Sequence, residues 1–110
     1  MKKIKIASVE TEILTFTDGT CLESRHDPDC CEYNYADFSQ VDDLAREWEF
    51  EHPLIFESCE GGFRFGNENK MVFVPCYSIQ NGYYSYDVDI LLNGKEVLRG
   101  VDCDHKDDEW

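Results

Sequence analysis

The sequence predicts an α+β domain, in which a largely antiparallel sheet of about six strands carries one amphipathic helix on its apolar face. Asn-Gly pairs at 81–82 and 93–94 interrupt alternating apolar and polar residues, a pattern typical of consecutive β-hairpins. Apolar residues recur at helical spacing between residues 40 and 50. The 110 residues contain no internal repeat and no Pro-, Gly- or Ser-rich linker, so we expect a single domain over 1–110. Its ordered part is expected at about 4–103, with 104–110 as a frayed acidic tail.

The N-terminal part is predicted to contribute strands at 4–7, 11–17 and 20–25, where β-branched and aromatic residues are frequent. Asp18-Gly19 suits a two-residue hairpin turn between the second and third of these strands. A two-residue turn at this place predicts that Phe16 lies opposite Cys21.

Residues 40–50 are predicted to form the helix. Ser39 is a suitable N-cap, and Asp42 gives a weak capping box with it. The helical spacing comes from Val41, Leu44, Ala45 and Trp48. His52-Pro53 is expected to end the helix, because a residue before proline disfavours the α conformation.

After the helix, strands are predicted at 54–59, 63–65, 71–80, 83–92 and 95–99. The two Asn-Gly turns should join the last three of these strands into an antiparallel β-meander. Alternation places Val88 and Ile90 on the apolar face that receives the helix, and Val74 and Cys76 on the other face.

The chain is strongly acidic, with 24 Asp and Glu against 10 Lys and Arg and a formal net charge of −14. Nucleic acids and anionic membranes are bound through cationic side chains, so this charge argues against both as partners. The excess acids either keep a small domain soluble or form a recognition face for a cationic partner. We therefore expect a protein partner; the oligomeric state is open.

The setting predicted from the sequence is cytoplasmic. The N-terminal Lys residues resemble the start of an export signal, but Glu10 and Glu12 interrupt before an apolar run of adequate length. No stretch approaches the ~20 apolar residues that a membrane-spanning helix needs. The six cysteines are accordingly expected to be reduced thiols rather than three disulfides.

The most concentrated chemistry lies at residues 26–32, where one imidazole, two thiols and carboxylates are consecutive. Thiolate and imidazole are the ligands that zinc prefers, and four of them can close a tetrahedral site. The predicted metal ligands are His26, Cys30, Cys31, Cys103 and His105, if the last strand ends near the cluster. Paired C-x-x-C motifs are absent, so folding without a cofactor is expected, with zinc as the alternative.

Two other interpretations of the same cluster stay open. His26 could act as the base for a Cys30 nucleophile, but the neighbouring acids raise a thiol pKa and so disfavour the thiolate. Alternatively the cluster is structural: His26 and Asp27 bond turn backbone, Asp29 caps a short helical turn, and Cys30 or Cys31 enters the core.

Two motifs resemble a family of small bacterial and phage proteins, a domain of unknown function. The first runs from residues 17–20 to the His-Asp-Pro-Asp-Cys-Cys-Glu stretch at 26–32 and on to 35–38. The second is Val-Pro-Cys-Tyr-Ser-Ile-Gln-Asn-Gly-Tyr-Tyr-Ser at 74–85. The resemblance implies a bacterial or phage-encoded cytoplasmic protein, and it brings no activity, ligand or catalytic residue.

Together these observations favour a non-enzymatic binding or regulatory module, of the kind that a phage or mobile element encodes against a host protein. The alternative is a zinc-binding or thiol-dependent protein built on His26, Cys30 and Cys31.

Overall fold

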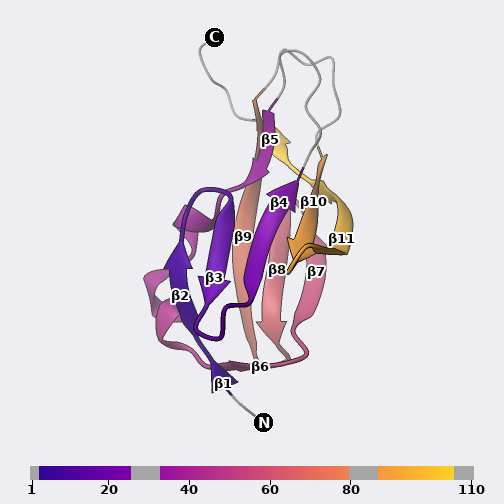
Figure 1. Cartoon of the computed structure of the whole chain (residues 1–110). Helices are drawn as coiled ribbons and strands as arrows, with labels where there is room; N and C mark the ends of the chain where they lie inside the picture. Colours follow the sequence, from indigo (N-terminus) through magenta and orange to yellow (C-terminus); the bar gives the residue numbers. More distant parts are fainter. Residues whose placement is uncertain (1–2, 26–32, 80–86, 106–110) are drawn as a thin grey trace.

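The computed structural model describes residues 3–25, 33–79 and 87–105, and within these ranges the chain is nearly all β-sheet (Figure 1). Two sheets of five strands and one of two strands are present. No helix of seven or more residues occurs in the described ranges. The predicted α+β fold, with a helix packed on one sheet, is therefore wrong.

The first sheet is antiparallel throughout and has the order β11-β10-β4-β3-β2. Its strands are β2 (Ile6–Val9), β3 (Ile13–Phe16), β4 (Cys21–Arg25), β10 (Asp87–Leu92) and β11 (Lys95–Asp102). The N-terminal hairpin and the C-terminal hairpin thus meet through the pairing of β4 with β10.

The second sheet has the order β12-β9-β8-β7, with β5 paired to β9 as well. Its strands are β5 (Tyr33–Ala36), β7 (Ile55–Cys59), β8 (Gly62–Asn67), β9 (Lys70–Ile79) and β12 (Asp104–His105). β12 runs parallel to β9, and all other pairs are antiparallel. The small third sheet joins β1 (Lys3–Ile4) to β6 (Phe50–Glu51).

The predicted C-terminal meander is wrong, because β9 and β10 belong to different sheets. β10 pairs with β4 and β11, whereas β9 pairs with β8, β5 and β12. Val88 and Ile90 are buried as predicted, but Val74 and Cys76 are buried too. Two facing sheets explain this result, since each strand turns its apolar side toward the same core.

Two short 3₁₀ turns, η1 (Phe38–Gln40) and η2 (Asp43–Glu47), replace the predicted helix. The Asp37 side chain accepts from the Ser39 N–H and the Asp42 side chain from the Leu44 N–H, so each aspartate starts a separate turn. Val41 between the turns is extended, and Leu44 is 70% exposed. The apolar spacing therefore does not define one buried helix face.

The turns between strands were predicted with mixed success. Thr15 lies opposite Cys21, so the hairpin loop around Asp18 is one residue longer than predicted and the Phe16–Cys21 pairing is wrong. The Asn93-Gly94 turn is confirmed, with φ of 51° and 84° and Leu92 paired to Lys95. Residues 81–82 lie outside the described ranges.

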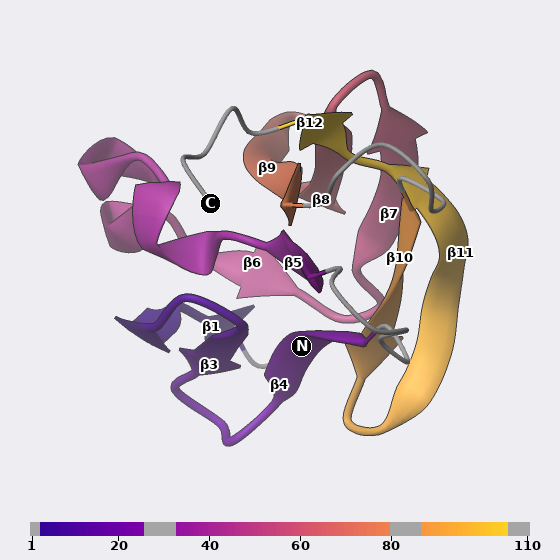
Figure 2. The same cartoon turned by 90° about the horizontal axis from the view of Figure 1, so that it is seen from above.

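Aromatic side chains fill the space between the sheets. The five most buried phenylalanines are each at most 1% exposed: Phe16, Phe38, Phe50, Phe63 and Phe65. Phe16 meets Phe65 edge to face, with ring centroids 5.9 Å apart, and meets Phe50 at 6.3 Å. The edge strands β7 and β11 of the two sheets lie side by side (Figure 2). Among the described residues, no backbone strand pairing joins them.

Candidate functional site

An open apolar groove lies where the edges of the two sheets come together. It has a volume of about 760 Å³ and is lined by His52, Pro53, Leu54, Phe56, Leu92 and Val97. The first three of these come from the segment that leads into β7, Phe56 lies in β7, and the last two come from β10 and β11. Leu54 is buried, whereas Phe56, Leu92 and Val97 are only half-buried and present apolar surface to the groove.

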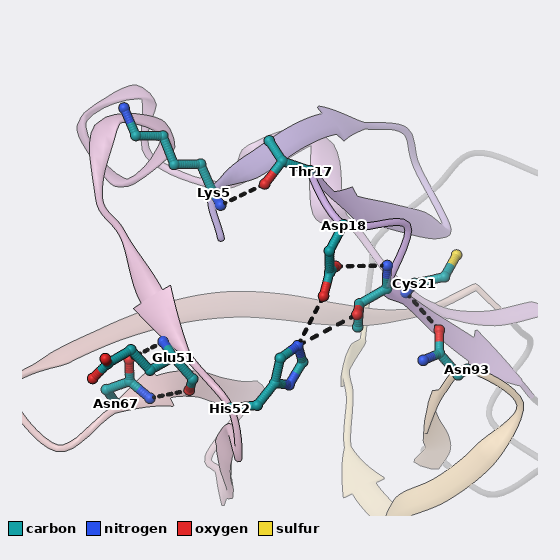
Figure 3. Close-up of polar contacts among 9 residues, drawn as sticks. Lys5, Thr17, Asp18, Cys21, Glu51, His52, Asn67 and Asn93 are labelled. Carbon is teal, nitrogen blue, oxygen red and sulfur yellow. Dashed lines mark hydrogen bonds and ion pairs between the residues drawn. The ribbon is translucent and has the colours of Figure 1, made fainter. Parts of the chain in front are cut away.

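Hydrogen bonds fix the loops around this groove. The Cys21 N–H donates to Asn93 Oδ1 at 2.9 Å, which ties the β10–β11 turn to the start of β4 (Figure 3). The Thr20 N–H donates to Asp18 Oδ1 at 2.9 Å, an Asx-type arrangement that orients the carboxylate. Two segments far apart in the sequence, the loop at 18–21 and the turn at 93–94, are thereby held together.

Asp18 and His52 form a polar pair at the groove. His52 Nε2 lies 3.1 Å from Asp18 Oδ2 (Figure 3). Hydrogen bonds from the Thr20 backbone and side chain, together with the contact to His52, lower the pKa of Asp18 from its ordinary 3.8 to about 2. The carboxylate is therefore ionised at neutral pH, and its described partners include no Lys or Arg side chain.

The geometry around His52 does not suit nucleophilic catalysis. A catalytic triad needs the acid on one ring nitrogen and the nucleophile on the other. Here Thr20 Oγ1 at 3.5 Å and Asp18 at 3.1 Å both face Nε2. Thr20 is also only 6% exposed, so a substrate has little access to its hydroxyl. The arrangement places an imidazole and a carboxylate side by side, with the imidazole in the groove lining.

The predicted metal ligands are only partly described by the structure. His26, Cys30 and Cys31 lie outside the described residues, as does the side chain of His105. Cys103 is 5% exposed and lies next to Cys76, which is fully buried. Within 3–25, 33–79 and 87–104, no group of three or more His, Cys, Asp or Glu side chains is arranged to hold a metal ion. A zinc site therefore stays a prediction.

No family model, curated protein or solved structure matches this chain. The resemblance to small bacterial and phage proteins consequently stays a hypothesis. In the described part of the chain, we find no helix with the length and apolar character required to cross a membrane.

Sequence reasoning missed the groove and both members of its polar pair. Asp18 was interpreted as a turn residue and His52 as the end of a helix, and these residues are 34 positions apart. The sequence predicts strands at 54–59 and 95–99. It carries no signal that their edges meet.

Proposed function

We propose that this protein is a non-enzymatic binding module whose groove takes an apolar side chain from a basic segment of a partner protein. The observation that supports this proposal is the groove itself, a largely apolar surface whose lining residue His52 contacts the ionised Asp18 carboxylate. Sites with an apolar lining and a few oriented polar groups are typical of ligand recognition. A cytoplasmic setting and a phage or mobile-element origin belong to the same proposal.

Charge selects the kind of partner. The formal net charge of −14 attracts cationic segments and repels acidic ones at low ionic strength. A lysine or arginine next to the bound apolar side chain meets a carboxylate whose described contacts are His52 and Thr20. In the proposed complex, burial of the apolar side chain stabilises binding, and the contact of its basic neighbour with Asp18 orients the bound segment.

The proposal is tested with two labelled peptides that share a central leucine, flanked by lysines in one and by glutamates in the other. Binding is followed by fluorescence anisotropy, and the contact site by NMR shifts of the Leu92 and Val97 methyl groups. We expect the lysine peptide to bind at least about tenfold more tightly at low salt, a difference of 1.4 kcal/mol. Raising the salt concentration should weaken this binding.

Two substitutions separate the apolar and charged contributions. Val97→Gln puts a polar amide into the groove and should abolish binding of the lysine peptide. Asp18→Asn should reduce the preference for lysine over glutamate. The matched control is Phe73→Gln, since Phe73 is 47% exposed on β9 and does not line the groove. Equal binding of both peptides, or methyl shifts confined to other residues, would contradict the proposal.

A further inference from the structure

Cys76 of β9 is adjacent to Cys103, the residue immediately before β12, although 27 positions separate the two cysteines in the sequence. β12 pairs in parallel with β9, with Asp104 opposite Tyr77 and His105 opposite Ser78. One step back in this register places Cys103 opposite Cys76. Neighbouring strands are about 4.8 Å apart, which falls within the Cα separation that a disulfide spans.

Both thiols are shielded from solvent, and their surroundings are fixed. Cys76 is 0% exposed and Cys103 is 5% exposed. The Cys103 thiol donates to the carbonyl oxygen of Val101 at 3.7 Å, and the Cys76 N–H donates to the carbonyl oxygen of Gly61. Both cysteines are free thiols. The fold therefore brings two reduced thiols together without linking them.

We propose that Cys76 and Cys103 form a redox-sensitive pair that closes to an intramolecular disulfide and fastens β12 to β9. The oxidant is a small-molecule disulfide. One protein thiolate attacks a sulfur of this molecule, which releases the first small thiol and leaves a mixed disulfide on the protein. The second protein thiolate then attacks the mixed disulfide, forms the Cys76–Cys103 bond and releases the second small thiol. Two protein thiols are oxidised and one small disulfide is reduced to two thiols.

The environment of the pair sets the speed of this reaction. Hydrogen bonding with the Cys103 thiol, then burial, then the charges of Cys103, Asp102 and Asp104 raise the pKa of Cys76. The reactive thiolate is therefore scarce in the closed fold at neutral pH. β12 is only two residues long, so its opening exposes the pair at small cost to the rest of the sheet. Oxidation should accelerate in mild denaturant, which opens β12.

The experiment treats the folded full-length chain with oxidised glutathione at pH 8, blocks remaining thiols in acid, and maps the disulfides by peptide mass spectrometry. We expect one peptide pair that joins Cys76 to Cys103. The midpoint of urea unfolding should increase after oxidation and return to its starting value with dithiothreitol, because a crosslink restricts the unfolded chain.

Control variants identify the bond. Cys103→Ala should abolish the shift in the urea midpoint, and Cys59→Ala, which removes a half-buried cysteine, should retain it. The double variant C30S/C31S removes competing thiols and should still form the Cys76–Cys103 bond. Glutathione left on either cysteine without a crosslink, or a crosslink of Cys76 or Cys103 to another cysteine, would overturn the proposal. Peptide mapping of the unmodified sequence decides this even if a variant fails to fold.

Discussion

The aromatic core and the apolar groove are built from the same two sheets, yet one is closed and the other is open. Around Phe65, rings from three elements meet edge to face or tilted, and Phe65 is 0% exposed. Next to this core, Leu92 and Val97 line an open groove of about 760 Å³ together with Phe56, which lies opposite Phe65 on the neighbouring strand. Rings from several elements fill the core around Phe65, whereas a single ring, Phe56, and the aliphatic side chains of Leu54, Leu92 and Val97 leave the groove open.

This difference separates the residues that stabilise the fold from the residues of the proposed binding groove. Removing a methyl group from a closely packed interior lowers the free energy of unfolding, because the cavity that it leaves cannot collapse fully. Substituting a half-buried residue at an open groove lowers the free energy of unfolding much less. The residues of such a surface can therefore vary to suit a partner. The proposed binding groove thus lies beside a core that tolerates little change.

The largest expected effect is the loss of a core ring. Phe65→Ala should lower the free energy of unfolding by about 3–5 kcal/mol, since it removes a fully buried ring and leaves a cavity. Urea denaturation followed by circular dichroism measures the change. Phe73→Ala is the matched control and should cost less than about 1 kcal/mol, because Phe73 is 47% exposed. Equal losses in both variants would show that the core and the outer face do not differ as described.

A second comparison uses two glycines with positive φ, Gly66 in the β8–β9 pair and Gly94 in the β10–β11 turn. A Cβ at Gly66 would lie 2.0 Å from the carbonyl oxygen of Lys70, whereas a Cβ at Gly94 would meet nothing within 4 Å. Gly94→Ala should cost about 1–2 kcal/mol from backbone conformation alone. Gly66→Ala should cost more than about 3 kcal/mol, because the β8–β9 pairing must also shift.

Thermal and urea unfolding of both alanine variants measure these costs. If Gly66→Ala proves no more destabilising than Gly94→Ala, the backbones of β8 and β9 do not approach each other as closely as the structure has them.

The same contrast explains what the sequence could predict. The positions of several strands and the Asn93-Gly94 turn follow from neighbouring residues, so local patterns located them, but β5, β6 and β12 were not predicted. Pairing partners do not follow in this way. The signal at 81–82 favoured β9 beside β10, but β10 pairs with β4, more than 60 positions earlier. The prediction of a helix is wrong for a local reason, since Asp37 and Asp42 each cap the start of a separate turn.

The candidate site was beyond local patterns for a related reason. Asp18 and His52 meet only after β3, β4 and the segment leading to β7 are in place. The predicted metal ligands at 26–32 lie outside the described residues. The zinc prediction is therefore tested by metal analysis of the purified protein. Concentrated chemistry in the sequence and a formed groove in the fold are thus separate signals.

The smallest expected effect concerns the rim of the groove, and it depends on pH. The pKa of Asp18 is lowered in the folded state to about 2, below its ordinary 3.8. Protons therefore bind the unfolded chain more readily at this group. Its contribution to stability is fully present above about pH 4 and is lost as the pH falls through about 2. Asp18→Asn removes this contribution, so the stability gap between the two proteins should narrow as the pH falls from 4 to 2.

Urea unfolding of both proteins at matched pH values measures this gap, and the other carboxyl groups cancel because both chains carry them. A gap that stays constant from pH 5 to pH 2 would mean that the carboxylate is not held by Thr20 and His52 in solution. Because Asp18 also directs the proposed lysine contact, the same titration connects the rim to binding. The lysine peptide should lose its advantage over the glutamate peptide as Asp18 becomes protonated, even while the aromatic core stays folded.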